Sequence, residues 1–290
     1  MSASTLGVAV LGVIGGSGLY QMPGLTAMEP LTASTPFGEA SDGIVRGRLG
    51  ETTVVFLPRH GRAHSRSPSA LNYRANIYAL KSFGVTHVLS VSAVGSLREE
   101  IAPGDLVVPH QFIDRTSLRP STFFDRDVVA HVSMADPVCP IMAAAVAEGA
   151  RSTGANTHVG QTYVCIEGPR FSTRAESRLF RQWGADIIGM TNVPEAFLAR
   201  EAELPYSTLA LATDYDSWRE HDEAHVDEIM AVMAKNVSRA QAVVRHLAAA
   251  LPDVSASPAR GALKFAVMTK WDSVSAEARA RYALLLGDRG

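Results

Sequence analysis

Cysteine is scarce in this sequence, and neither sign of charge dominates it. Only Cys139 and Cys165 occur in 290 residues, without metal-ligand spacing, which favours a reducing compartment over a disulfide scaffold. The formal net charge of −2 gives no electrostatic reason to expect nucleic acid or an anionic membrane as a partner. These features argue against disulfide-rich, nucleic-acid-binding and membrane-surface proteins.

The sequence also lacks an apolar run long enough to cross a bilayer. Its N-terminal run, Leu6 to Ile14, has nine residues, whereas a spanning helix needs about 20. No basic residue precedes the run, and the glycine-rich residues 15–18 follow it in place of a signal-peptide cleavage site. We therefore predict a buried first strand that enters a glycine loop, in a soluble, cytoplasmic protein.

Apolar runs of strand length alternate with helical patterns along most of the chain. The runs predict strands at Ala9–Ile14, Thr53–Leu57, His87–Val91, Leu106–Pro109, Thr162–Ile166, Ile187–Met190 and Leu209–Ala212. Helical patterns are found at Asn72–Phe83, Pro140–Gly149, Arg174–Trp183, Pro194–Ala202, Val226–Leu251 and Ser275–Leu285. This alternation predicts an α/β fold with a mostly parallel or mixed sheet. Residues 1–251 are interpreted as one domain, and residues 252–290 as a C-terminal extension with a short helix that packs on the same domain.

Glycine and polar side chains follow the first three predicted strands. Ser17 lies in VIGGSGLY, Arg59 and His60 lie in LPRHGR, and Ser92 and Ala93 lie in SVSAVGS. Backbone amides, hydroxyls and a planar guanidinium are groups that bind phosphate. Each loop alone is also compatible with a tight turn or a solvated basic loop, but together the loops predict a phosphate site.

Later strand ends add side chains suited to a heteroaromatic ligand. Phe171 in CIEGPRFST is either core or a wall for ring stacking, and Met190 in IIGMTN is either core or a soft floor beneath a sugar. Asp214 and Asp216 in TDYDSW project to one face at a strand end, where open α/β sheets build their sites. The alternative for the aspartates is an acidic surface turn. We predict a phosphate site beside a polar heteroaromatic site.

These motifs, taken in order, resemble the trimeric purine nucleoside phosphorylase family, in the branch that acts on 5′-methylthioadenosine. The resemblance is carried from about residue 7 to about residue 245 by GVIGGSGL, PRHGR, NYRANI, SAVGSLREEI, HQFIDRT, IEGPRFSTRAES, GADIIGMTNVPE and ATDYD. It implies a single domain with a mixed central β-sheet flanked by helices. It also implies a pentosyltransferase of methionine and purine salvage that converts methylthioadenosine and phosphate to adenine and 5-methylthioribose 1-phosphate. A homotrimer or a dimer of trimers is expected, with no metal and no cofactor besides the co-substrate phosphate.

The resemblance also assigns roles to individual residues. It implies phosphate binding by Ser17, Arg59, His60, Ser92, Ala93 and Thr191. It implies nucleoside binding by Phe171, Ser172, Met190, His131, Val226, Ile229 and Met230, with His131 reaching the 5′ end from a neighbouring subunit. It implies that Asp214 and Asp216 are the catalytic pair. A neutral Asp214 is predicted to donate the proton that the leaving adenine needs at N7, which requires a raised pKa.

Two other functions remain open from the sequence. A broader purine nucleoside phosphorylase, acting on adenosine or on 6-oxopurine nucleosides, would use much of the same site. A non-catalytic nucleoside-binding protein would need the purine contacts alone, and a phosphate set beside the sugar argues against it. By the resemblance, Met230 lies in the segment that contacts the 5′ substituent and determines which substituent is accepted. It is bulkier than the leucine expected at this position.

Overall fold

The computed structural model describes residues 8–61, 66–219 and 226–287. Its strands are β1 Val10–Gly15, β2 Leu25–Leu31, β3 Ile44–Leu49, β4 Thr52–Pro58, β5 His87–Ser96, β6 Leu106–Val108, β7 Gln111–Arg115, β8 Thr157–Val159, β9 Thr162–Ile166, β10 Ile187–Gly189 and β11 Tyr206–Asp214. Its α-helices are α1 Tyr73–Ser82, α2 Pro140–Ser152, α3 Arg174–Gln182, α4 Asn192–Glu201, α5 Val226–Ala249 and α6 Ala276–Leu286. The short 3₁₀ turns are η1 Ser17–Tyr20, η2 Pro68–Ala70 and η3 Trp271–Ser273.

The strands of the described residues form one mixed sheet, which confirms the predicted α/β class. Strands β4, β1, β5 and β11 run parallel to one another in that order. Strand β10 pairs antiparallel with β5 and parallel with β9, while β2 and β3 form an antiparallel edge. Because the central strands are parallel, their carboxyl termini lie together at one end of the sheet. The loops predicted to bind ligand are at this end.

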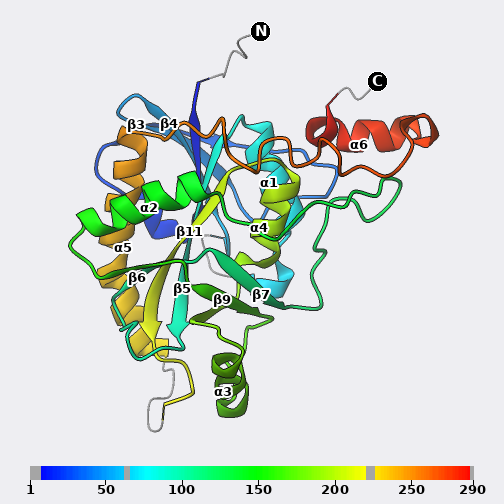
Figure 1. Cartoon of the computed structure of the whole chain (residues 1–290). Helices are drawn as coiled ribbons and strands as arrows, with labels where there is room; N and C mark the ends of the chain where they lie inside the picture. Colours follow the sequence, from blue (N-terminus) through cyan, green and yellow to red (C-terminus); the bar gives the residue numbers. More distant parts are fainter. Residues whose placement is uncertain (1–7, 62–65, 220–225, 288–290) are drawn as a thin grey trace.

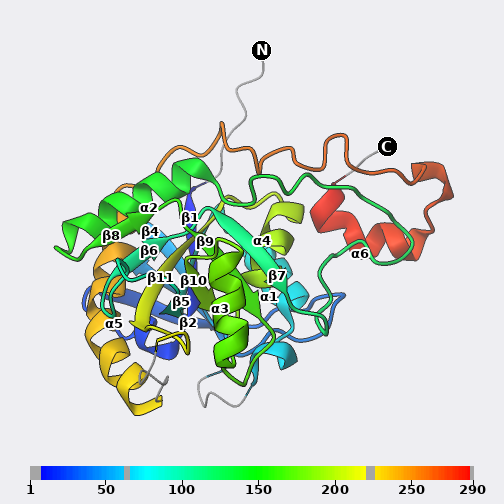
Figure 2. The ribbon, with the colours of Figure 1, turned by 60° about the horizontal axis from the view of Figure 1, so that its bottom comes forward.

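Helices cover both faces of the central strands (Figure 1). Alternate residues of β4 point to opposite faces: Val54 and Phe56 join the core under α2 and α5, and Val55 and Leu57 join the core under α1 and α4. Figure 2, turned by 60°, shows the same layering, with α2 and α5 on the side opposite α1 and α4. This two-sided burial explains why the central strands have near-continuous apolar sequences.

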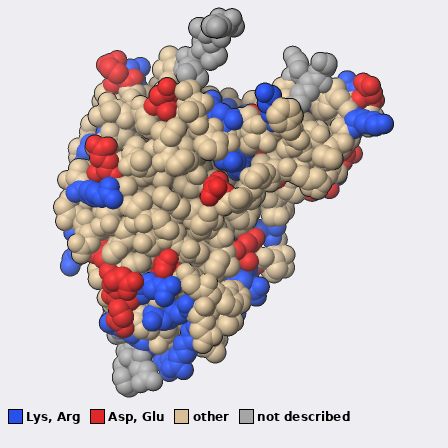
Figure 3. Space-filling view, in the orientation of Figure 1, with Lys and Arg blue, Asp and Glu red and all other residues tan. Residues whose placement is uncertain are grey.

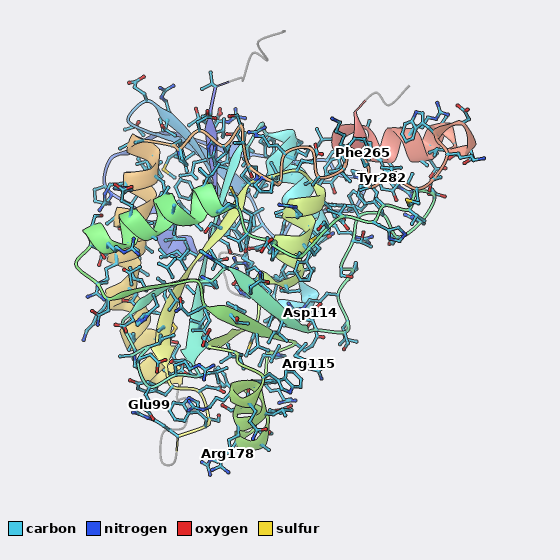
Figure 4. The ribbon with its side chains drawn as sticks, in the orientation of Figure 1. Glu99, Asp114, Arg115, Arg178, Phe265 and Tyr282 are labelled. Carbon is cyan, nitrogen blue, oxygen red and sulfur yellow. The ribbon has the colours of Figure 1, made fainter. Side chains whose placement is uncertain are left out.

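The C-terminal segment packs against the α1 and α4 side of the domain. Tyr282 of α6 is fully buried, and its ring lies 5.5 Å from that of Phe124 and 6.4 Å from that of Phe37, measured between centroids. Its hydroxyl donates a hydrogen bond of 2.8 Å to the Arg126 carbonyl. Figure 4 places Phe265 and Tyr282 far from Glu99 and Arg178, which lie at the carboxyl end of the sheet. The α6 contacts therefore stabilise the end of the domain that lies away from β5's carboxyl terminus.

The surface agrees with the near-neutral composition. Acidic and basic side chains both occur on the face shown in Figure 3, and basic ones gather toward its lower end, near α3. Within the described ranges, no helix is long and apolar enough to cross a membrane. Neither feature identifies a ligand. The candidate functional residues are therefore expected in the loops at the carboxyl ends of the strands.

Candidate active site

A cavity of about 590 Å³ lies at the carboxyl ends of the parallel strands. Its walls come from the loops after β1, β4, β9 and β10, the ends of β5 and β11, and one face of α5. Ser92 and Ala93, predicted to follow a strand, lie within β5 because this strand continues to Ser96. Among its lining residues are Arg59, His60, Ser92, Ala93, Phe171, Met190, Thr191, Asp214, Asp216, Ile229 and Met230. The structure therefore brings most of the predicted site residues to one hollow.

Four predicted residues do not line this cavity or are not described there. Ser172 is buried beside Phe171, and its hydroxyl has no hydrogen-bond partner among the described residues. Val226 is 64% exposed at the start of α5. His131 is exposed, and its backbone amide bonds to the Ala266 carbonyl in the C-terminal extension. The side chain of Ser17 lies outside the described residues.

Arg59 is held rigidly by the Glu195 side chain from α4. Its guanidinium donates to both carboxylate oxygens, at 2.8 and 3.0 Å, and both side chains are almost completely buried. It also donates to the Ser90 hydroxyl at 2.6 Å and to the Val91 carbonyl at 3.1 Å. Burial alone would lower the pKa of Arg59, but Glu195 reverses this and raises the pKa above its ordinary value. Arg59 is a fixed charge whose orientation is set by β5 and α4.

A second network of side-chain hydrogen bonds connects β5 to α4 behind the same wall. Ser92 donates to Asn192 Oδ1 at 2.8 Å, and Asn192 Nδ2 donates to the hydroxyls of Tyr206 and Thr208 at 2.6 and 2.7 Å. Thr191 stands at the N-cap of α4, and its side chain makes no capping hydrogen bond. Val193 departs from helical geometry (φ −119°, ψ 132°), so Thr191 offers an anion its hydroxyl and neighbouring backbone amides instead of a regular helix end.

Gly189, at the end of β10, packs directly against the side chain of a buried tyrosine. A Cβ atom at Gly189 would lie 1.9 Å from the Tyr163 hydroxyl. Tyr163 is fully buried, and burial raises the pKa of its phenol. Only glycine therefore fits at the end of β10, next to Met190 and Thr191.

The loop after β4 folds back on itself beside Arg59. His60 Nδ1 donates to the Arg66 carbonyl at 2.9 Å, and the Arg66 amide donates to the His60 carbonyl at 3.4 Å. The carbonyl can only accept, so this bond fixes the proton on Nδ1. Arg66, Ser67 and Pro68 then continue along the cavity wall. The basic loop thus places a second arginine in the site.

The aspartate pair occupies a different part of the cavity. Asp214 Oδ2 accepts from the Thr213 hydroxyl at 2.7 Å, and Oδ1 accepts from the Asp216 amide at 2.8 Å. Asp216 is only 3% exposed, and its Oδ2 has no hydrogen-bond partner among the described residues. Burial, reinforced by the charge of Asp214, raises the pKa of Asp216 to about 6. Asp216 can therefore hold a proton closer to neutral pH than an ordinary aspartate can.

Gly95 leaves room for this pair. A Cβ atom at Gly95 would lie 2.9 Å from Asp214 Oδ1 and 3.2 Å from the Asp216 Cβ. The register of β11 against β5 shifts between Ala212 and Asp214, which is the irregularity expected of a bulge next to a site. The predicted i, i+2 geometry of an unbroken strand therefore ends at Asp214, and Asp216 lies in the following turn with a φ of 49°.

Glu167 fixes the wall that carries Phe171. Its carboxylate accepts from the Ser69 hydroxyl, the Ser117 amide and Arg119, the last at 3.1 Å. Burial would raise the pKa of Glu167, but these hydrogen bonds together hold it at about 2. The anion joins the loops at residues 66–70, 116–119 and 167–171. Thr173 and Glu176 then form the predicted capping box that starts α3.

One face of α5 closes the cavity with apolar side chains. Ile229, Met230, Met233 and Val237 line it. Gln241 on the next turn donates to the Gly18 carbonyl at 2.8 Å, which ties α5 to the first glycine loop. The cavity therefore combines a cationic, hydroxyl-rich part, a carboxylate pair and an apolar wall. Such a combination suits a ligand with an anionic, a heterocyclic and an apolar portion.

Several residues that shape the site were not predicted from the sequence. Glu195 and Asn192 act from behind the cavity, and Arg66 and Met233 line it directly. Glu195 gave a visible signal, a lone acid at the start of an apolar helix, but its partner 136 positions away is a matter of tertiary structure. In the described parts of the chain, no cluster of three or more His, Cys, Asp or Glu side chains could hold a metal ion.

Known proteins resemble the chain over almost its whole length. The phosphorylase superfamily model matches residues 10–249. An S-methyl-5′-thioadenosine phosphorylase of Geobacter sulfurreducens is 51% identical over 280 residues, which cover 96% of this chain and 98% of that protein. The crystal structure of a methylthioadenosine phosphorylase from an antarctic soil metagenomic library has a TM-score of 0.91 at 49% identity, covering 96% of this chain and 99% of that chain. A mutant adenosine/methylthioadenosine phosphorylase of Schistosoma mansoni, in complex with adenine, has a TM-score of 0.80 at 35% identity, covering 96% and 98% of the two chains.

Proposed function

The chain belongs to the phosphorylase superfamily, and from this we infer that it is a pentosyltransferase that cleaves S-methyl-5′-thioadenosine with phosphate. The products are adenine and 5-methylthioribose 1-phosphate. The observation that carries this function is the presence of the Arg59 wall and the aspartate pair in one cavity, with the apolar face of α5 beside them. Each of the three parts of the substrate pair has a chemically matching surface.

The reaction needs little covalent chemistry from the protein. The bond between N9 of adenine and C1′ of the ribose breaks, the electron pair leaves with adenine, and a phosphate oxygen forms a bond to C1′. The ribose becomes cationic as this happens, so a phosphate held against C1′ stabilises it and then captures it. We assign the phosphate to the wall of Arg59, His60, Ser92, Ala93 and Thr191, with Ser17 beside it. In this assignment, Met190 lies beneath the ribose.

The departing adenine becomes anionic and needs a proton at N7. The aspartate pair is the acid in the cavity that can supply it. The sequence predicts Asp214 as the donor, and burial, which raises the pKa of Asp216 to about 6, makes Asp216 a second possible donor. Asp214 accepts hydrogen bonds from the Thr213 hydroxyl and the Asp216 amide. In this position it can also accept from the 6-amino group or relay the proton. Phe171 and Ser172 flank the purine in this assignment.

The 5′-methylthio group faces the apolar side chains of Ile229 and Met230. His131 lies outside the cavity of its own chain, so its predicted role requires a neighbouring copy. We therefore assign the active enzyme to a homotrimer, or to a dimer of trimers, in which His131 completes the 5′ end of the adjacent site. The exposed position of His131 beside the C-terminal extension is compatible with such a contact.

A second candidate is a broader enzyme that also uses adenosine. It is favoured by the solved Schistosoma mansoni relative, whose name includes both substrates. The aspartate pair argues against 6-oxopurine nucleosides, because a carbonyl at C6 would face carboxylates instead of a hydrogen-bond donor. The two candidates share the chemistry and differ only at the 5′ wall.

Adenine or hypoxanthine release from methylthioadenosine, adenosine and inosine, each with and without phosphate, tests these functions. We expect phosphate-dependent release from methylthioadenosine, slower release from adenosine and none from inosine. Comparable rates for adenosine would assign the broader activity, and faster cleavage of inosine would contradict the role of Asp214 and Asp216. Binding of nucleosides without cleavage under any condition would mean a non-catalytic binding protein.

A further inference from the structure

The predicted phosphate wall has less positive charge than its sequence suggests. Arg59 is its most buried cation, but the Glu195 carboxylate lies within 2.8 Å of its guanidinium. At the distance of an ion pair, the charge of Glu195 largely cancels that of Arg59 for a ligand in the cavity. Besides Arg59, the described lining contains one further arginine and two acidic residues, Asp214 and Asp216, as its Arg, Lys, Asp and Glu side chains. With Arg59 alone, the charged side chains of the described lining would therefore supply no net positive charge to attract an anion.

Arg66 is that arginine, and its position is set by His60. The two residues exchange backbone and ring hydrogen bonds of 2.9 and 3.4 Å, so the Arg66 backbone lies directly against the Arg59–His60 corner. The Arg66 side chain is partly exposed and lines the cavity. Across the described residues it has no acidic partner, in contrast to Arg74, which pairs with Asp125, and Arg119, which pairs with Glu167.

We propose that Arg66 is a phosphate-binding residue that supplies the uncompensated positive charge of the phosphate site. Arg59 then acts mainly as a rigid hydrogen-bond donor, and Arg66 provides the net attraction and the salt-sensitive part of phosphate affinity. A guanidinium suits this role because it stays charged and can contact two phosphate oxygens together. The proposal rests on the proposed phosphorolysis, because it assigns a residue to the co-substrate of that reaction.

Arg66→Gln tests the proposal because it removes the charge while keeping a side chain of related length. Arg66→Lys keeps the charge, and exposed Arg151→Ala at the end of α2 is the control for losing an arginine far from the cavity. For each protein, the measurements are the KM for phosphate, the KM for methylthioadenosine, and the Kd of inorganic phosphate by calorimetry without nucleoside. The KM for phosphate is then repeated over a series of ionic strengths.

We expect Arg66→Gln to raise the KM and the Kd for phosphate about tenfold or more, because a charge-assisted hydrogen bond is lost. The KM for methylthioadenosine should change much less, and the dependence of phosphate affinity on salt should become shallower. Arg66→Lys should recover part of the affinity, and Arg151→Ala should match the wild type. Wild-type phosphate affinity in Arg66→Gln would overturn the proposal.

The outcomes also separate this proposal from the proposed function. If the wild-type protein releases adenine only with phosphate but Arg66→Gln keeps normal phosphate affinity, the function stands and the role of Arg66 is wrong. If the wild type neither binds phosphate nor releases adenine, the proposed function itself fails. If Arg66→Gln raised the KM for phosphate and the KM for methylthioadenosine by the same factor, the substitution would have damaged the cavity in general. This result would also contradict a phosphate-specific role for Arg66.

Discussion

The carboxylate of Glu195 accepts hydrogen bonds of 2.8 and 3.0 Å from the guanidinium of Arg59. Only 2% of the Glu195 side chain and 3% of the Arg59 side chain are exposed. The pair joins the end of β4 to α4 beneath the cavity. Two ions in such a buried position are costly to desolvate, so this pair is better understood as a device for orientation than as a source of stability. Its role is to hold the Arg59 donors at fixed positions in the wall.

Replacing Glu195 with glutamine should damage both the fold and phosphate binding. The change leaves Arg59 charged, buried and without its counter-ion, which typically costs about 3–5 kcal/mol. Urea unfolding should report this loss, and the KM for phosphate should rise in whatever protein remains folded. Glu277→Gln is the matched control, because Glu277 pairs with Arg281 while its side chain is 86% exposed. Equal stability of the two variants would contradict an anchoring role for Glu195.

Replacing Asp214 with asparagine should lower kcat for methylthioadenosine by on the order of 10²-fold or more, as expected for loss of a general acid. Stopped assays of adenine release at saturating substrate measure this directly. Asp216→Asn is the necessary comparison, because burial raises the pKa of Asp216 to about 6 and this carboxyl could also hold the proton. A near-normal rate for Asp214→Asn, with the loss found in Asp216→Asn, would transfer the donor role to Asp216.

Glu201 should make the protein less stable as the pH rises. Burial raises the pKa of Glu201 to about 7 despite hydrogen bonds from the Phe123 amide and the Thr122 hydroxyl. The folded state therefore binds the proton more tightly than the unfolded state, whose carboxyl has an ordinary pKa of 4.5. The free energy of unfolding should fall between about pH 5 and pH 7, by up to about 3 kcal/mol, and should level off above this range.

Glu201→Gln should flatten this part of the pH profile, because glutamine can keep hydrogen bonds to both partners without ionising. Urea unfolding at pH 5 and pH 8 measures the difference. Exposed Glu148→Gln on α2 should retain the wild-type profile. A Glu201→Gln profile as steep as that of the wild type would show that Glu201 does not carry this dependence.

Replacing His131 with alanine should raise the KM for methylthioadenosine without abolishing phosphate binding. The effect requires a second copy, because the residue lies outside the cavity of its own chain. Kinetics should therefore be combined with sedimentation, so that the assembly state of the variant is known. An unchanged KM in an intact oligomer would remove His131 from the site. A raised KM that follows dissociation alone would assign His131 to the interface.

The central fold could be read from the sequence because its strands are buried on both faces. The predicted run Thr162–Ile166 is β9, and the run at His87–Val91 extends to Ser96 in β5. The missed strands are those without such runs: most residues of β2 are exposed, and β7 is only partly buried. Their strand state depends on pairing with neighbours, which a local pattern does not encode.

The site was predictable to the extent that ligand-facing residues lie in loops with unusual composition. The two aspartates and the basic corner at Arg59 stood out because charge directly after a buried strand needs a reason. The supporting residues did not stand out. Asn192 and Tyr163 have ordinary local sequences, and their roles come only from packing beneath Ser92 and Gly189.

The apolar wall of α5 gives a paired test of substrate preference. The resemblance assigned Val226 and Ile229 to the same 5′ pocket, but only Ile229 lines the cavity, and Val226 is 64% exposed. Ile229→Asn should lower kcat/KM for methylthioadenosine by about 10-fold or more, because a polar group replaces apolar contact with the methylthio group. Adenosine should lose less, since its 5′-hydroxyl can hydrogen-bond to asparagine.

Val226→Asn is the control on the same turn of the same helix. Measured as the ratio of kcat/KM for methylthioadenosine to that for adenosine, Ile229→Asn should shift the preference and Val226→Asn should not. If Val226→Asn shifts the ratio equally, the N-terminal turn of α5 must move toward the ligand when substrate binds, because Val226 does not line the cavity in this structure. If neither variant shifts the ratio, the discrimination between the substrates lies elsewhere in the wall, and Met233 becomes the next residue to replace.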